Sequence, residues 1–176
     1  MVNDSSRSRL GYSFFSRHAF LVAPELLGKL LCRYLNGDTI KLRITETECY
    51  YGENDSACHA HKGKTDRTRI MYESGGLAYI YLCYGIHNML NIVTGNTGFP
   101  EAVLIRGAGE FNGPGKLTRA MRIDRRLNWE NLVESNNLWI EDDRTVLSFK
   151  TDRRVGISYA HDIDRNRLWR FLSVKE

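Results

Sequence analysis

The sequence predicts an α+β fold: a single compact domain, mostly antiparallel β-sheet with hairpins and a few short helices. Three observations support this prediction. Strand-like runs with alternating side chains recur along the 176 residues. Turn-forming pairs separate neighbouring runs, and Asn36-Gly37 is a strong hairpin signal. Helix-like stretches are short, and no linker, repeat or low-complexity segment divides the chain.

The first half of the chain is predicted to hold one short helix and a long hairpin. Residues 20–28 predict a helix, with its proline near the first turn. Residues 29–35 and 39–50 predict two strands joined at Asn36-Gly37. Residues 52–69 show no regular period and are expected to form an extended loop. A loop of that length in a compact domain is usually functional or disordered.

The second half is predicted to be richer in strands. A turn at 74–76 precedes a second hairpin, formed by 77–84 and 87–94 around Gly85. A strand at 102–106 and a helix at 116–123 follow. Later strand candidates are 137–141, 154–159 and 168–174. We expect residues 1–176 to form one domain, with about residues 1–12 flexible.

Composition argues for an ordinary soluble globular protein. Hydrophobic residues make up 42% of the chain and charged residues 26%. No apolar stretch reaches the roughly 18 residues that a membrane span needs, so we expect no membrane partner. The polar segment 1–7 leads into no long apolar core, so we also expect no secretory signal.

The cysteines predict reduced thiols rather than a disulfide framework. They are widely and irregularly spaced, three of them inside strand-like segments: Cys32, Cys49, Cys58 and Cys83. The segment 58–61, Cys-His-Ala-His, resembles half of a metal site. Its partners are missing at any usual spacing, so we expect no metal and no other cofactor.

The charge pattern permits nucleic-acid binding without requiring it. The net charge is +4, and two segments are basic, 61–69 and 119–126. Either segment alone is more simply a solvated surface. Two of them in a small protein favour a phosphate-binding face, and Lys64, Arg67 and Arg69 are the candidates in the first.

The most informative run is 44–50, because it places two carboxylates in a strand. Side chains alternate along a strand, so Ile44, Glu46, Glu48 and Tyr50 are expected to share one face. A solvent-facing carboxylate is the simpler interpretation of either Glu. An apolar face instead allows Glu48 to accept a proton from water, with the two carboxylates raising each other's pKa. Glu46 is alternatively the partner of a basic residue.

Aromatic and polar side chains nearby predict a slot for a flat ligand. Tyr50, His59, Tyr81 and Tyr84 each offer a π-face, although a tyrosine-rich core explains them equally well. Tyr84 precedes a glycine at a turn and is expected to project. Two further residues are ambiguous. Asn91 is either a satisfied core amide or a selectivity group, and Arg106 is a candidate partner of Glu46 or Glu48.

An ordered set of motifs resembles one known family. The segments 46–52, His59, 65–69, 79–85, 89–91, 103–106, 113–117 and 154–156 closely resemble the alkyladenine (3-methyladenine) DNA glycosylases of the type found in mammals and many bacteria. The match covers the chain from about Pro24 to Val174. Any one motif is weak, whereas the ordered set is highly specific. Thr68, Gly75-Gly76 and Cys49 depart modestly from the usual pattern.

The resemblance implies a monofunctional, metal-free hydrolase that removes damaged purines from double-stranded DNA during base excision repair. Glu48 would activate the water, and Arg106 and the Val155 carbonyl would position it. The remaining roles that it implies concern the flipped base and the DNA groove. Tyr50, His59 and Tyr81 would sandwich the flipped base, Asn91 would exclude guanine, and Tyr84, Ile86 and His87 would enter the minor groove. The enzyme would be a monomer in the cytoplasm, at the nucleoid, or in a nucleus.

Two other functions remain open at this point. A non-catalytic binder of damaged DNA explains the basic segments and the rings but gives Glu48 no role. A hydrolase of free nucleosides explains the acid and the aromatic slot without DNA. Release of a base from a damaged duplex separates these alternatives from the glycosylase.

Overall fold

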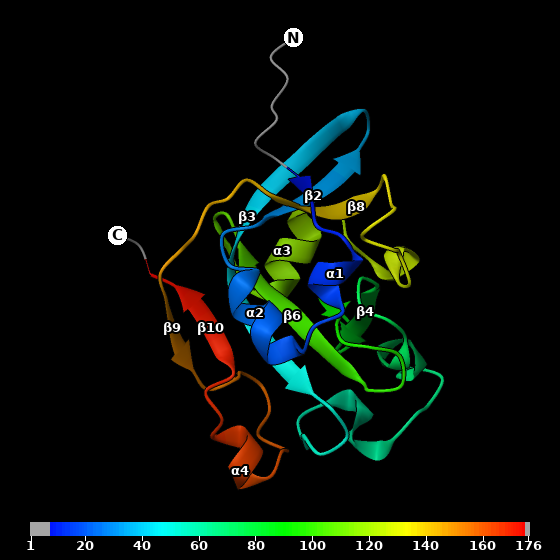
Figure 1. The fold of residues 1–176 in the computed structure, drawn as a ribbon, viewed down its shortest axis with the longest axis vertical. Coiled ribbons are helices and arrows are strands. Elements are labelled where there is room, and N and C mark those ends of the chain that lie inside the picture. The colour runs from blue at the N-terminus through cyan, green and yellow to red at the C-terminus, as the bar shows by residue number, and fades with distance from the viewer. Residues whose placement is uncertain (1–7, 175–176) are drawn as a thin grey trace.

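The computed structural model describes residues 8–174, which fold around one ten-stranded sheet (Figure 1). The strands are β1 (Ser8–Arg9), β2 (Leu30–Leu35), β3 (Asp38–Tyr51), β4 (Ala78–Cys83), β5 (His87–Val93), β6 (Glu101–Ala108), β7 (Phe111–Asn112), β8 (Leu138–Asp142), β9 (Phe149–Asp152) and β10 (Arg170–Ser173). Their main order is β1-β8-β2-β3-β6-β5-β4. Every pairing among these strands is antiparallel, which confirms the predicted α+β class.

Strand β3 is the central element of the sheet. Its first half pairs with β2, and its second half pairs with β6 on one side and β10 on the other. The predicted hairpin at Asn36-Gly37 is confirmed, because both residues adopt the positive φ angles, 53° and 94°, that such a turn requires. The long strand therefore carries residues from the hairpin tip to the centre of the molecule.

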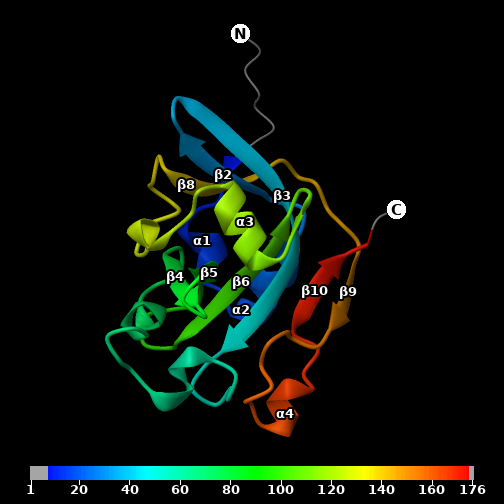
Figure 2. The same ribbon diagram turned by 180° about the vertical axis from the view of Figure 1, so that it is seen from behind.

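The helices are short, and two of them pack on the sheet. They are α1 (Tyr12–Phe15), α2 (Ala19–Glu25), α3 (Pro114–Ala120) and α4 (Asp162–Arg165), with 3₁₀ turns η1 (His59–Lys62), η2 (Arg69–Tyr72) and η3 (Arg125–Leu127). Helix α2 packs against β3, and α3 packs against β5. Figure 1 shows α2 in front of the sheet, and Figure 2, seen from behind, shows α3 in front. Across residues 8–174, no helix has both the length and the apolar character needed to cross a bilayer.

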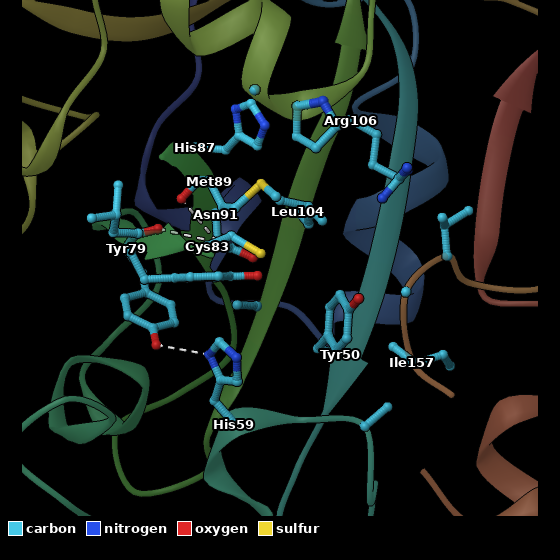
Figure 3. A pocket seen from close by; sticks show the side chains of 18 of the residues that line it. Tyr50, His59, Tyr79, Cys83, His87, Met89, Asn91, Leu104, Arg106 and Ile157 are labelled. Carbon is cyan, nitrogen blue, oxygen red and sulfur yellow. Dashed lines mark hydrogen bonds between the residues drawn. The ribbon is translucent and has the colours of Figure 1, made fainter. Parts of the chain in front are cut away.

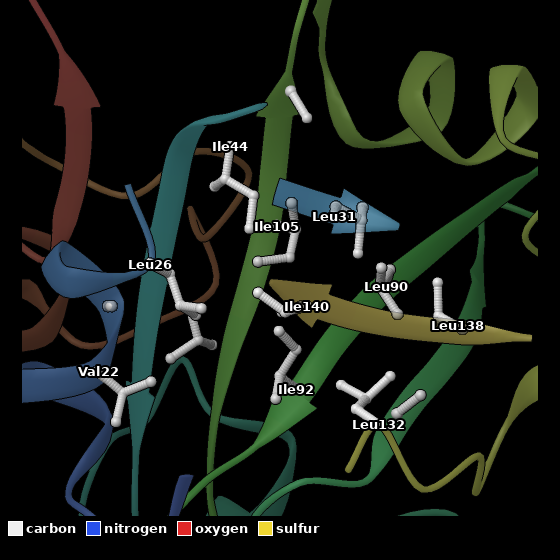
Figure 4. Packing of buried hydrophobic residues seen from close by; sticks show 14 of the residues in the cluster. Val22, Leu26, Leu31, Ile44, Leu90, Ile92, Ile105, Leu132, Leu138 and Ile140 are labelled. Carbon is white, nitrogen blue, oxygen red and sulfur yellow. The ribbon is translucent and has the colours of Figure 1, made fainter. Parts of the chain in front are cut away.

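The main core gathers buried side chains from α2 and α3 and from strands β2, β3, β5, β6 and β8 (Figure 4). Leu26 at the end of α2, Ile44 from β3 and Ile105 from β6 are each fully buried. Burying an aliphatic side chain of this size contributes roughly 1.5–3 kcal/mol. This core holds the backbone of β3 in place while the opposite side of its second half carries polar groups.

One expectation about β3 is wrong. The register between β3 and β6 shifts on both sides of Glu46, so the strand is irregular between Ile44 and Thr47. Ile44 is buried in the core, whereas Glu46 faces the other side with Glu48 and Tyr50. An extra residue at a bulge reverses the alternation of side chains. Ile44 therefore does not share a face with the carboxylates.

Several predicted boundaries also need correction. The predicted strand at 154–159 is wrong, because the segment is irregular and Gly156 has a φ of 76°. Strand β9 precedes it and was not predicted, since all its side chains are exposed and give no alternation of apolar and polar residues. Pro24 lies in the last turn of α2 rather than the first. The predicted loop at 52–69 contains η1.

The start of the chain is partly described. Ser8–Arg9 pairs with β8, and α1 begins at Tyr12. The expectation of a flexible start falls otherwise on residues 1–7, which lie outside the described residues. The helix predicted at 116–123 begins two residues earlier, at Pro114, and ends before Arg122, whose φ is 47°.

Candidate active site

A pocket of about 760 Å³ opens beside the second half of β3 (Figure 3). Its lining comes from β3, the β4–β5 hairpin, β6, the segment 112–116, the loop carrying η1 and the segment 155–159. Residues far apart in the sequence therefore meet here. The lining includes nine of the predicted site residues: Tyr50, His59, Arg67, Tyr81, Tyr84, His87, Asn91, Arg106 and Val155.

Glu48 lies directly behind this lining and is fully buried. The Tyr50 hydroxyl donates to Glu48 Oε2 at 2.9 Å, and the Val155 amide donates to Oε1 at 2.7 Å. Arg106 Nε lies 3.4 Å from the same Oε1. All three partners line the pocket, whereas Glu48 contributes no lining surface of its own. The carboxylate is therefore separated from the cavity by a single layer of residues.

The ionisation of Glu48 reflects two opposing influences. Burial raises the pKa of Glu48 above its usual value, while Arg106, the Val155 amide and the Tyr50 hydroxyl lower it. The expected mutual effect of Glu46 and Glu48 is not the cause of this shift. Burial also raises the pKa of Tyr50, so its hydroxyl stays protonated and donates to the carboxylate.

Glu46 has the structural role that the sequence offered as one alternative. Its Oε1 accepts from Arg106 Nε at 2.9 Å and from Arg170 Nε at 2.7 Å. Arg106 thus lies between the two carboxylates and is partner to both. Since Arg170 comes from β10, this network joins three strands behind the pocket.

The rings are arranged around the pocket on two sides. His59 packs edge-on against Tyr81, with ring centroids 4.5 Å apart, and its Nδ1 lies 2.9 Å from the Tyr79 hydroxyl. Tyr50 lies across the cavity from His59 (Figure 3). Burial and the charge of Arg67 lower the pKa of His59 to about 4, so the imidazole is neutral at pH 7. The rings of Tyr50, His59 and Tyr81, which face the pocket, are therefore uncharged at that pH.

Asn91 lies on β5 at the back of the pocket and is only 4% exposed. Its amide nitrogen donates to the backbone carbonyls of Tyr79 and Met89, at 3.2 and 3.3 Å. Those bonds orient the side chain and use its donors. The amide is therefore satisfied as a core group, and it also lines the cavity.

Tyr84 occupies the tip of the β4–β5 hairpin and is 89% exposed. Tyr84 and Gly85 have φ angles of 49° and 72°, and the Ile86 amide donates to the Cys83 carbonyl. This is a tight turn of the type that favours Asn or Gly, so a bulky residue there is strained. Ile86 is also exposed, at 68%, whereas His87 is partly buried against the cavity. The prediction that Tyr84 projects is confirmed.

One of the three predicted basic residues lines the pocket, and the other two lie outside its lining. Arg67 lines the pocket, and its guanidinium carbon lies 5.0 Å from the Tyr81 ring. Lys64 and Arg69 are exposed and lie over the rings of Tyr72 and Trp129, at 5.4 Å each. Of the second basic segment, Arg126 is engaged by Asp124 in an exposed ion pair.

The segment 58–61 does not converge on one point. His59 contacts Tyr79, whereas His61 Nδ1 lies 2.6 Å from the Glu53 carbonyl. Within residues 8–174, no group of three His, Cys, Asp or Glu side chains is placed to hold a metal ion. The two histidines of this segment therefore have separate roles.

Two groups at the site were not predicted from the sequence as site residues. Tyr159 lines the pocket and donates from its hydroxyl to the Ala57 carbonyl. Arg154 lies behind Tyr50, in a buried ion pair with Asp55. The segment 154–156 was noted as part of the resemblance, which is the one signal that pointed here. Neither residue sits in a regular element whose period would have placed it.

Comparison with known proteins agrees with this geometry. The family model described as Methylpurine-DNA glycosylase (MPG) matches residues 13–112 and 108–176. Proteins named "Putative 3-methyladenine DNA glycosylase" from Psychrobacter cryohalolentis and Natranaerobius thermophilus are each 42% identical, over 180 and 188 residues. These matches cover 85% of both the chain and the first relative, and 93% of the chain and 94% of the second.

A relative of the same name from Methanocella arvoryzae is 44% identical over 179 residues, covering 90% of this chain and 88% of that protein. The family match includes strands β3 to β6 and the segment 155–159, which all line the pocket. The chain belongs to the methylpurine-DNA glycosylase family.

Proposed function

We propose that this protein is a monofunctional DNA glycosylase that hydrolyses the N-glycosidic bond of damaged purines in double-stranded DNA. The observation that carries the proposal is the position of Glu48. Its carboxylate is fully buried and is held by three residues that line an aromatic pocket. The exposed Tyr84 lines the same pocket. Family membership and the names of the relatives support the same reaction and its place in base excision repair.

Glu48 is the proposed general base. A carboxylate has about four lone-pair positions. Tyr50 and Val155 each use one, and Arg106 lies beside Oε1, so acceptor capacity remains for a water. A water that reaches Oε1 would lie between Arg106 and the Val155 backbone, both of which line the cavity. Arg106 and the Val155 carbonyl are the proposed positioning groups for this water, while the Val155 amide holds Glu48 itself.

The proposed reaction adds water to the sugar and releases the base. Glu48 accepts a proton from the water as its oxygen bonds to C1′ of the deoxyribose. The bond from C1′ to the purine nitrogen breaks, and its electron pair leaves with the base. An alkylated, cationic base departs as a neutral molecule, and the carboxylate stabilises the positive charge that develops on the sugar.

Recognition would require the base to leave the duplex. Extrusion costs a few kcal/mol, and an inserted side chain at the vacated position offsets part of that cost. Tyr84 is the proposed wedge because it projects fully from a strained turn, with Ile86 and His87 beside it. The flipped base, still attached to the DNA, would stack between Tyr50 on one side and His59 with Tyr81 on the other.

Asn91 is the proposed selectivity group. Its nitrogen is held by two backbone carbonyls, which fixes the amide at the back of the pocket. A normal guanine carries an exocyclic 2-amino group, and we propose that this group clashes with Asn91. Lys64, Arg67 and Arg69 would contact phosphates around the opening. We further propose that the protein acts as a monomer wherever the cell keeps its DNA, in the cytoplasm, at the nucleoid or in a nucleus.

The deciding experiment is release of a free base from single-lesion oligonucleotide duplexes. We expect the wild-type protein to release 3-methyladenine, 7-methylguanine or hypoxanthine and to leave an abasic site. A matched undamaged duplex and the corresponding free nucleosides serve as controls. Binding to the damaged duplex with no release would support a non-catalytic binder. Cleavage of the free nucleoside at the same rate would support a nucleoside hydrolase.

A further inference from the structure

Arg154 is a buried arginine on the side of Tyr50 that faces away from the ligand. Its side chain is fully buried and forms a two-pronged ion pair with Asp55, at 2.6 and 2.8 Å. It also donates to the backbone carbonyls of Cys49 and Asp164. Its guanidinium carbon lies 4.8 Å from the Tyr50 ring and 5.1 Å from the Trp169 ring. One side chain thus joins β3 to the loops on both sides of the pocket.

Arg154 contacts one partner of Glu48, Tyr50, and directly precedes another, Val155. Tyr50 donates to one carboxylate oxygen, and Val155, the next residue after Arg154, donates to the other. Asp55 is itself fixed, since it accepts from the backbone amides of Tyr51 and Ala57. Displacement of Arg154 would therefore move the Tyr50 ring and the Val155 amide together. Glu48 would lose two of its three partners.

The guanidinium of Arg154 contacts the Tyr50 ring although one of its donors has no hydrogen-bond partner among the described residues. Arg154 Nε is buried and has no hydrogen-bond partner among residues 8–174. An arginine selected only to fill a polar cavity would have its donors satisfied. The same guanidinium instead stacks on the aromatic ring, an arrangement that planar arginine favours.

We infer that Arg154 is a positioning residue for base excision: from behind the pocket it fixes the Tyr50 ring and the Val155 amide against Glu48. The inference rests on the proposed function. Arg154 touches neither the base nor the reacting water, because Tyr50 lies between it and the cavity. Its effect is transmitted through the geometry and the charge around the carboxylate.

The charged and titratable groups near Glu48 make that effect measurable by pH. They are Tyr50 and Glu46 from β3, Arg106 from β6, Arg170 from β10, and Arg154 and Tyr159 from the segment that follows β9. Burial raises the pKa of Glu48, and the charge of Arg154 is one of the influences that lower it. Loss of that charge moves the acid limb of the pH–rate profile to higher pH, because the base must be ionised.

The test measures single-turnover excision and duplex binding for Arg154→Gln. We expect the rate to fall about 100-fold, the scale of an error of about 1 Å in a reacting group. Affinity for the damaged duplex should stay within about threefold, because the phosphate-binding residues are untouched. The acid limb should move to higher pH. Far-UV circular dichroism establishes that the variant is folded.

Arg167→Gln is the matched control. Arg167 lies over the same Trp169 ring, at 4.5 Å, and pairs with Asp164 in the same network, but it does not touch Tyr50 or Asp55. We expect its excision rate to stay within about twofold of wild type. An equal loss in both arginine variants would show a general effect on the loop and would overturn the inference.

Asp55→Asn separates the charge of Arg154 from its clamp. It weakens the same clamp, so the rate should also fall, but it keeps the positive charge of Arg154 and removes a negative one. The acid limb should therefore move to higher pH by less than in Arg154→Gln. An equal shift of the acid limb in both variants would overturn the contribution of the Arg154 charge. If Arg154→Gln does not fold, Arg154→Lys replaces it, and we expect a reduced rate with the limb near its wild-type position.

Two failures are distinguishable. If the wild-type protein releases no base, the proposed function fails and this inference fails with it. If the wild type excises and Arg154→Gln excises within about threefold of it, only the positioning role of Arg154 is overturned.

Discussion

Glu48 and Tyr84 differ in how the fold holds them at one pocket, which Tyr84 lines and behind whose lining Glu48 lies. Glu48 is fully buried and has three partners on its two oxygens, whereas Tyr84 is 89% exposed and sits in a strained turn. A group that performs chemistry gains from fixed neighbours, because they need not reorganise during the reaction. A group that enters a duplex must project from the surface. Under the proposed function, this difference separates the group that acts in the reaction from the group that contacts DNA.

The largest expected effect comes from Glu48→Gln. The amide keeps the size of the side chain but cannot accept the proton of water, and a general base contributes roughly 10²–10⁴-fold to the rate. We expect base release to fall by about that factor while binding to the damaged duplex is retained. Single-turnover release and fluorescence anisotropy measure the two quantities.

Glu46→Gln is the control for that change. Glu46 is the nearby carboxylate, but it pairs with Arg106 and Arg170 rather than with Tyr50 and Val155. We expect a smaller loss than for Glu48→Gln. Retained turnover in the Glu48 variant would show that Glu48 is not the general base. The proposed difference in role between Glu48 and Tyr84 would then be wrong.

The next largest effect concerns the recognition side. Tyr84→Ala removes an exposed ring, and stacking of one ring on a base is worth about 1–3 kcal/mol, or roughly 10- to 100-fold. We expect excision to fall by that much from stable base pairs and by less from mismatches, which already open easily. The melting temperature should not fall, because the ring is exposed and its backbone is strained. Equal losses on both duplexes would count against a wedge.

A smaller change is expected for selectivity. Asn91→Ser shortens the amide at the back of the pocket, and we expect release of guanine-type bases to rise by about tenfold, on the scale of one buried polar conflict. A panel of single-lesion duplexes measures the profile. Asn88→Ser, on the same strand but outside the pocket lining, is the control. An unchanged profile in the Asn91 variant would remove its role in selectivity.

The smallest effect on activity, but a clear one on stability, concerns His59. Its pKa is lowered to about 4 in the fold, so the unfolded chain binds a proton more readily. The contribution of the neutral imidazole to stability is fully present above the pKa of His59 in the unfolded chain. It is lost as the pH falls toward 4. Between pH 7 and pH 5 this loss is about 2 kcal/mol. Denaturant unfolding of wild type and His59→Phe at both pH values measures this loss. If the free energy of unfolding changes equally with pH in the two proteins, the imidazole does not titrate as expected.

The sequence predicted the local elements well where the chain is regular. The Asn36-Gly37 hairpin, the long central strand and the projecting Tyr84 are each confirmed. Each of these follows from local rules, since glycine tolerates positive φ and strand side chains alternate. The helix predicted at 20–28 begins one residue earlier and ends three residues earlier, and the strand predicted at 29–35 begins one residue later.

Errors occurred where a local rule was overruled. The bulge next to Glu46 reversed the side chains before it, and the segment 154–159 followed tertiary contacts instead of a strand period. The family resemblance identified residues that the pattern alone left ambiguous. It did not indicate that Glu48 would be screened from the cavity by Tyr50, Arg106 and Val155.

The sequence by itself determined the fold class, the family and which side chains carry chemical capacity. These depend on the order of residue types, which the printed chain contains in full. Only the tertiary structure decided that Glu48 takes the buried position, that Glu46 pairs with two arginines, and that Arg154 supports Tyr50 from behind. Such contacts join residues as much as 124 positions apart, and their strength depends on distance and burial, which no local pattern encodes.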